Sequence, residues 1–246
     1  MTRPLPDTDL ARIAPLPDAQ KRQELEMFKL GNPSITYKPL RANYADILNV
    51  RPEMFDRVDP TELSVIESKV KRQARWDKEE LANLRVARGL HALAQEKMII
   101  GRREEFYPFQ MRMGWKVNLW LPTILAIKEA PFATFIDPRG TRGLNEVARR
   151  FAFSMMHERI RVEDPDYAEV RLSIIKFGQP TEIDADDKTK GIRPARLFTD
   201  EGVDLIPLDE LERMVATTYE IWREVSEGRE RETRRRAGGA GPLFGE

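Results

Sequence analysis

The apolar residues of this chain change their spacing partway along it, and that change most constrains the fold. Between residues 60 and 98 they recur every three or four positions, the spacing of one face of an α-helix. In MRMGWKVNLWLP, residues 111–122, they concentrate at alternate positions, the spacing of a β-strand. A chain in which helices are followed by strands predicts an α+β protein with an α/β-like core.

The helical part carries two start signals. The segment DPTE, residues 59–62, places an N-cap aspartate, a proline at the first helical position and a glutamate three residues after the cap. Asp77 begins a second signal of the same kind, and an apolar stripe follows each one. We therefore predict an antiparallel helical hairpin over about residues 60–98, with a polar joint near Trp76.

The second half predicts a mixed β-sheet with a crossover helix and a C-terminal helix. The expected elements are a strand at 115–121, a β-hairpin of 123–127 and 132–136 hinged at 128–131, a helix at 144–160, a strand at 167–178, a polar loop at 181–194, a strand pair around ARLFT and VDLIP (195–207), and a helix at 208–227. The helical hairpin forms a layer that precedes this sheet.

These patterns divide the chain into four parts. They are an extended, proline-punctuated arm with a short helix (1–57), the helical hairpin (58–100), an α/β core domain (101–228) and a charged, Gly-rich flexible tail (229–246). Residues 1–20 carry four prolines, so we expect them to be irregular. Aromatic residues scattered through the arm would suit a segment that wraps a protein partner; they are Phe28, Tyr37, Tyr44 and Phe55.

Composition excludes several kinds of site and location. The chain has no cysteine and 2 histidines, so we expect no disulfide, haem, zinc or iron–sulfur centre. It has no apolar run long enough for a signal peptide or a membrane span, so we expect a soluble, cytoplasmic protein with no membrane contact. Lys and Arg total 41 and Asp and Glu also total 41, so contact with nucleic acid would need a local basic patch.

The loop DPRGTRG, residues 137–143, lies between an expected strand and an expected helix. Its glycines, the helix N-terminus and the forked side chains of Arg139 and Arg142 together could bind an anion. An alternative needs only a turn, in which Asp137 accepts nearby amides and Pro138 fixes the backbone. The spacing matches neither a P-loop nor a dinucleotide-binding motif.

Arginines are concentrated from this loop through the next helix. The candidates for binding nucleic acid or another anion are Arg139, Arg142, Arg149, Arg150, Arg159 and Arg161. The alternative is a solvated helix whose arginines pair with Glu146, Glu158 and Glu163.

The order of elements from 111 to 178 resembles the core of the PD-(D/E)XK restriction-endonuclease-like superfamily. In that superfamily an Asp follows a Pro on one strand, an acidic-x-Lys lies on the next, and the acids hold Mg²⁺. Here Pro122-Thr123 stands in place of Pro-Asp, and Asp137-Pro138-Arg139 in place of acidic-x-Lys. The resemblance thus implies an endonuclease-like core with weak or lost cleavage. Asp137 is its one candidate catalytic residue and metal ligand, and no cofactor is expected unless Mg²⁺ serves an active nuclease.

The end of the chain offers a second partner contact. The last residues, GPLFGE, place Leu243 and Phe244 after a Gly-rich stretch, as in a short peptide that docks in a partner's groove. Three consecutive arginines, 234–236, could contact phosphate instead. A tail without function is the alternative to both.

Three functional hypotheses follow. The first is a nucleic-acid-associated protein whose endonuclease-like core contacts the phosphate backbone. The second is an adaptor or subunit of a multiprotein assembly, with residues 1–57 and the Leu243-Phe244 tail on its partner. The third is a Mg²⁺-dependent nuclease. The sequence leaves enzymatic activity open and favours its absence.

Overall fold

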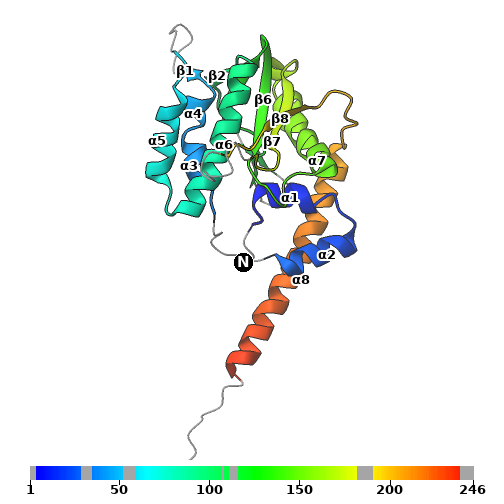
Figure 1. The fold of residues 1–246 in the computed structure, drawn as a ribbon. Helices are drawn as coiled ribbons and strands as arrows, with labels where there is room; N and C mark the ends of the chain where they lie inside the picture. The colour runs from blue at the N-terminus through cyan, green and yellow to red at the C-terminus, as the bar shows by residue number, and fades with distance from the viewer. Residues whose placement is uncertain are drawn as a thin grey trace, which may run out of the picture.

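A six-stranded sheet lies between two layers of helices in the computed structural model, which describes residues 4–28, 35–51, 59–106, 108–110, 116–181 and 191–238 (Figure 1). The strands, in sheet order, are β1 (Val50–Arg51), β2 (Ile100–Arg103), β5 (Thr123–Ile127), β6 (Ala130–Asp137), β7 (Arg171–Phe177) and β8 (Ala195–Thr199). The pairs β1–β2 and β6–β7 are parallel and the others antiparallel. The sheet is therefore mixed, and the predicted α+β fold class is confirmed.

One face of the sheet is covered by the helices that precede most of its strands. They are α3 (Lys38–Ala42), α4 (Tyr44–Ile47), α5 (Leu63–Gln73) and α6 (Asp77–Glu96). Their buried apolar side chains form one core with sheet residues such as Ile136 and Ile175. Helix α6 begins at the predicted Asp77, whereas α5 begins at Leu63 and not at Pro60, because Glu62 still has extended backbone angles.

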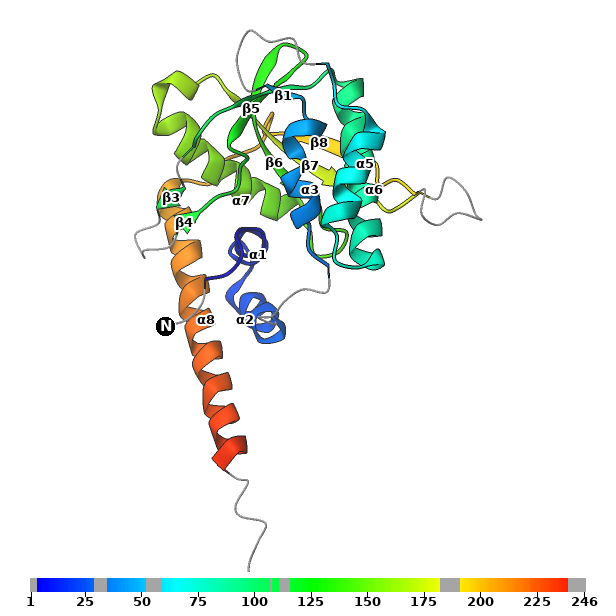
Figure 2. The same cartoon turned by 90° about the vertical axis from the view of Figure 1, so that its left-hand side faces the viewer.

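The opposite face is covered by the two ends of the chain. Helices α1 (Asp7–Ile13) and α2 (Asp18–Met27) pack there with α7 (Glu146–Met156) and α8 (Leu208–Gly238) (Figure 2). Trp222 of α8 is fully buried, and the ring of Phe28 meets it edge-on at 5.8 Å between centroids. A three-layer arrangement results, with a separate apolar core on each side of the sheet.

The expectation that residues 1–20 are irregular is wrong. Pro6 and Pro17 stand at the N-caps of α1 and α2, with φ of −58° and −59°. A proline at a helix start costs no hydrogen bond and already has a suitable φ, so these prolines begin helices and do not prevent them. Leu10 and Ile13 of α1 are buried in the core. The division into four parts stays a prediction.

The predicted hairpin and crossover helix are present. Lys128 and Glu129 form the turn between β5 and β6, with φ of 49° and 69°, as a two-residue hairpin loop requires. Helix α7 begins after Asn145, whose side chain accepts the N–H of Ala148 at 2.9 Å. It continues into a π-helical turn, His157–Val162, before β7.

Three strand predictions need correction. The alternating segment 115–121 contributes only β4 (Lys116–Val117), which pairs with β3 (Phe109–Gln110) in a separate small sheet. Residues 203–207 lead into α8 without forming a strand, so β8 has no partner from that segment. Strand β2, which has little apolar character, was missed because its place is set by pairing with β1 and β5.

Helix α8 is 31 residues long and runs well past the predicted end at residue 227. Its last turns leave the body of the protein, and residues 231–235 are exposed (Figures 1 and 2). Glu–Arg pairs such as Glu230–Arg234 support a helix that has no core to pack against. The start of the predicted flexible tail is therefore helical, while Leu243 and Phe244 lie outside the described residues. Within the described ranges no helix is long and apolar enough to cross a membrane.

Candidate functional site

Asp137 is the last residue of β6, and its side chain accepts hydrogen bonds from the loop that follows. Its side chain is fully buried and accepts the backbone N–H groups of Leu144 at 2.6 Å and Arg139 at 3.3 Å. Burial raises the pKa of this carboxyl, and the two hydrogen bonds partly oppose the rise. Lys176 lies beside it in register on β7 and donates to the carbonyl of Leu144. Asp137 thus holds the turn together, as the turn interpretation expects.

Arg193 fixes the same loop from the other side and was missed in the sequence. Its side chain is 5% exposed and donates to the carbonyls of Pro138 at 2.7 Å and Arg139 at 3.1 Å. It also donates to Phe177 at 3.1 Å and Gly178 at 3.0 Å. One buried guanidinium therefore ties the loop to the end of β7, over a sequence distance that no local pattern reveals.

The six candidate arginines are mostly committed to partners within the chain. Arg139 is bidentate to Asp9 at 2.9 and 3.0 Å, Arg149 stacks on Phe198 at 4.2 Å, Arg150 binds Asp204 at 2.7 Å, Arg159 binds Glu163, and Arg161 binds Asp200 at 2.7 Å. Within the described part of the chain only Arg142 has no such partner. The six do not form one open basic surface.

Asp137 also does not gather other acids around it. Across the residues that the structure describes, no three His, Asp or Glu side chains are placed to hold one metal ion. Thr123, which stands in place of a carboxylate in the endonuclease-like motif, is buried at the start of β5. It lines a different feature, a pocket at the sheet edge.

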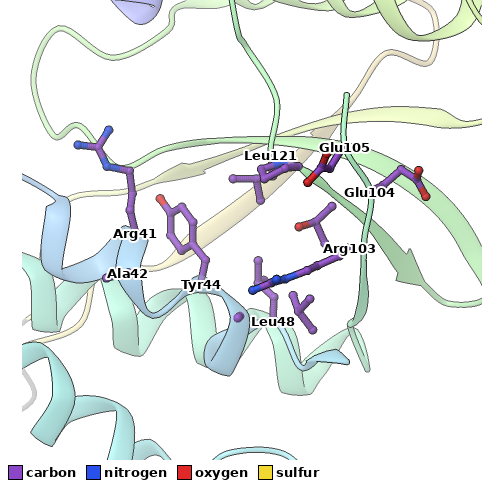
Figure 3. A pocket seen from close by; sticks show the side chains of 12 residues that line it. Arg41, Ala42, Tyr44, Leu48, Arg103, Glu104, Glu105 and Leu121 are labelled. Carbon is purple, nitrogen blue, oxygen red and sulfur yellow. The ribbon is translucent and has the colours of Figure 1, made fainter. Parts of the chain in front are cut away.

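This pocket, here called the Tyr44 pocket, has a volume of about 660 Å³ and lies where β1 and β2 end and β5 begins (Figure 3). Its lining residues are Arg41, Ala42, Tyr44, Ala45, Leu48, Val50, Arg103, Glu104, Glu105, Leu121, Pro122 and Thr123. Its residues thus come from α3 and α4 and from the ends of three strands, so the fold brings together segments that lie far apart in the sequence.

Some polar groups of the Tyr44 pocket have hydrogen-bond partners among the described residues, and others have none there. The Tyr44 hydroxyl is buried and has no hydrogen-bond partner among the described residues, and burial raises its pKa. Glu104 accepts from Arg102 at 2.9 Å. Arg41 and Arg103 are exposed, and neither forms an ion pair within the described ranges. The pocket thus combines apolar side chains with two arginines and two glutamates, Glu104 and Glu105. Protein interfaces are enriched in Arg and Tyr, so this lining is suited to contact with another protein.

The structure thus defines an α+β protein with a pocket at one sheet edge. A family model described as the sliding clamp-binding bacterial toxin SocB matches residues 8–232, and the chain belongs to this family. It is 37% identical over 231 residues to the DNA replication inhibitor toxin SocB of Caulobacter vibrioides (strain NA1000 / CB15N), covering 94% of this chain and 93% of that protein. No solved structure matches.

The family overturns the leading functional hypothesis. Nucleic-acid binding by an endonuclease-like protein is wrong as the description of this chain, because the family is described by its contact with a protein, the sliding clamp. The nuclease alternative is equally unsupported, and the protein-interaction alternative is the better one. The concentration of arginines did not produce an open basic surface, because four of the six pair with a carboxylate of this chain: Arg139, Arg150, Arg159 and Arg161. The resemblance to the PD-(D/E)XK superfamily is not tested by these findings and stays a prediction.

Proposed function

We propose that this chain binds a sliding clamp and thereby inhibits DNA replication. The match of the family model to residues 8–232 carries this proposal, since the family is described by clamp binding. The relative, which is 37% identical over nearly the full length of both chains, is named as an inhibitor of DNA replication. The predicted cytoplasmic location belongs with this proposal, because a bacterial clamp acts there.

The Tyr44 pocket is the proposed contact surface. It lies within the matched range and includes three exposed residues of the arm, Arg41, Ala42 and Ala45. Most other apolar residues of that arm cannot serve, since Leu10, Leu25 and Phe28 are buried in the core. Arg41 and Arg103 at the pocket would attract carboxylates on the clamp, while the pocket accepts an apolar side chain.

The Leu243-Phe244 tail is a weaker proposal. It lies outside residues 8–232, the range that the family model matches. In this chain it would add a second contact, which raises the effective concentration of the first.

Clamp binding is tested by calorimetric titration of the full chain with a purified bacterial sliding clamp. We expect saturable binding that the charge reversal Arg41→Glu/Arg103→Glu weakens at least tenfold. The matched control, Arg213→Glu/Arg223→Glu, changes charge equally at exposed positions of α8 and should bind normally. Absence of binding by the wild-type chain refutes the function. Equal binding by the pocket variant and the control refutes only the pocket.

Inhibition is tested by clamp-dependent primer extension in a purified system. The wild-type chain should slow extension, and the pocket variant should do so less at equal concentration. Added clamp should restore the rate, because inhibition through the clamp is a competition for it. Slowed extension that added clamp does not relieve would contradict this mechanism.

A further inference from the structure

The Tyr44 pocket is smaller than a stable protein interface. It is lined by 12 residues. A stable interface buries about 800 Å² on each partner and takes up roughly 20 to 30 residues a side. A clamp that docks at this pocket must therefore also cover surface next to it, and that surface begins at Glu104.

Glu104 connects the Tyr44 pocket to an aromatic pair. It lines the pocket directly after β2, accepts from Arg102 at 2.9 Å, and forms a side-chain hydrogen bond with Tyr167 (Figure 3). Tyr167 belongs to η2 (Pro165–Tyr167), a 3₁₀ turn before β7. Its ring meets that of Phe106 edge-on at 5.0 Å between centroids. The pocket lining and this turn are therefore in direct contact, although they are far apart in the sequence.

The turn that carries Tyr167 is open to a partner. Tyr167 and Phe106 are half-buried, so part of each side chain is accessible. The residues beside Tyr167 are exposed, and they are Asp164, Pro165, Asp166, Ala168 and Glu169. We call residues 165–169 together with Phe106 the Tyr167 ridge. Its aromatic rings thus lie among carboxylates that face solvent.

The composition and the rigidity of the Tyr167 ridge suit a protein contact. Aromatic residues are enriched at protein interfaces, and the rims of interfaces are polar. The Tyr167 ring packs on Phe106, and its hydroxyl is bonded to Glu104. A side chain that is already held in place loses little conformational entropy when a partner binds. The free chain therefore presents this ring ready for contact.

We propose that the Tyr167 ridge is a second part of the clamp-binding surface, continuous with the Tyr44 pocket. This inference rests on the proposed function, since the sliding clamp is the partner in both places. The combined surface runs from α3 and α4, across the end of β2, to the turn before β7. It fits a clamp surface with an apolar hollow that admits the edge of the Tyr167 ring.

Three identical substitutions test the contact. Ala45→Arg in the Tyr44 pocket, Ala168→Arg on the ridge and Ala92→Arg on α6 each add the same side chain at an exposed position with helical backbone. We expect Ala45→Arg and Ala168→Arg to weaken binding at least tenfold in calorimetric titration with a purified bacterial sliding clamp. Ala92→Arg lines neither surface and should bind as tightly as the wild type. The thermal midpoint of each variant should equal that of the wild type, because the added side chain points into solvent.

Two further variants test the ring itself. Tyr167→Ala should weaken clamp binding at least tenfold, and Tyr167→Phe, which keeps the ring, should restore most of the affinity. Absence of binding by the wild-type chain refutes clamp binding and the ridge with it. Equal clamp affinity of Ala168→Arg and Ala92→Arg, beside a wild-type chain that binds, overturns the ridge alone and leaves clamp binding intact.

Discussion

At the scale of single residues, the fold depends on a few buried charges whose partners are distant in sequence. Arg139 reaches Asp9 across 130 positions, and Arg193 reaches Pro138 across 55. Both contacts determine the shape of the loop at residues 137–143. The loop therefore takes its shape from its surroundings. Its glycines, Gly140 and Gly143, do not have positive φ, whereas Arg142 does, at 56°.

Replacement of Arg193 tests this dependence. Arg193→Ala leaves the carbonyls of Pro138, Arg139 and Phe177 without their donor, so we expect the free energy of unfolding to fall by about 3 kcal/mol. Urea denaturation measures the loss. Arg196→Ala, at an exposed position of β8, is the control and should change stability little. A loss of similar size in both variants would contradict the role of Arg193.

The pH dependence of stability should reflect Asp7. Burial raises the pKa of its carboxyl from 3.8 to about 6, against a hydrogen bond from the backbone of Asn118. The folded chain then holds this proton more tightly than the unfolded chain does. The contribution of Asp7 to stability is full below pH 4 and is lost as the pH rises through 6. Asp7→Asn stays neutral, so its advantage in unfolding free energy over wild type should grow between pH 4 and 6. A constant difference over that range would contradict the raised pKa.

At the scale of elements, helix α6 packs closely against the segment before β8 at Gly89. A Cβ at Gly89 would lie 1.8 Å from the carbonyl oxygen of Arg193. The backbone of Arg193 donates in turn to the carbonyl of Arg85 at 2.9 Å. The helix therefore lies directly against the chain that enters the last strand, and no side chain fits between them.

A pair of glycine substitutions tests that approach. Gly89→Ala should lower the free energy of unfolding by about 3 kcal/mol, because backbone atoms must shift to admit the methyl group. At Gly228 on α8 the added methyl group meets open space. Gly228→Ala should therefore raise the free energy of unfolding by about 0.5 to 1 kcal/mol, because Ala has the higher helix propensity. Thermal and urea denaturation of both variants give the comparison. Stabilisation by Gly89→Ala would show that the two backbones are farther apart.

Much of the element order follows from the sequence. The start of α6 at Asp77, the turn at Lys128-Glu129 and the helix after Asn145 all carry local signals that the structure confirms. Strand β2 and helix α1 were missed because neighbours stabilise them: β2 pairs on both sides, and α1 buries Leu10. A local sequence pattern predicts an element poorly where tertiary contacts supply most of the stability of that element.

The candidate site was less predictable than the fold. The arginines were visible as a concentration, but the carboxylates and carbonyls that engage them come from other elements. The Tyr44 pocket combines residues from 41 to 123, so no motif in the sequence identifies it. The buried Arg12 gave no sequence signal, because its partner Glu24 lies on the next helix.

At the scale of the whole molecule, the first helices complete the core on one face of the sheet. Leu10, Ile13, Leu25 and Phe28 are buried together with residues of α7 and α8. Helices α1 and α2 are thus part of the core. Its removal would uncover the apolar sides of two long helices.

Truncation at either end tests this arrangement. A chain that begins at residue 29 should lose its cooperative thermal transition and bind a hydrophobic dye, because the core around Trp222 becomes exposed. A chain that ends at Gly238 should keep the midpoint of the full chain. Scanning calorimetry measures the thermal transition of each truncated chain. If the chain that begins at residue 29 keeps a cooperative transition at the original midpoint, the structural role of α1 and α2 is contradicted.

The projecting part of α8 also makes the molecule easy to observe. Residues 230–238, at a rise of about 1.5 Å each, extend about 14 Å beyond Arg229, which still contacts α2. The chain has no cysteine, so a single thiol introduced at the exposed Arg235 takes one fluorophore or spin label. Such a probe is carried on a rod anchored by Trp222 and Val225 in the core, and its tumbling reports the rotation of the whole particle. The increase in rotational correlation time on assembly then gives the size of the complex without disturbing the Tyr44 pocket.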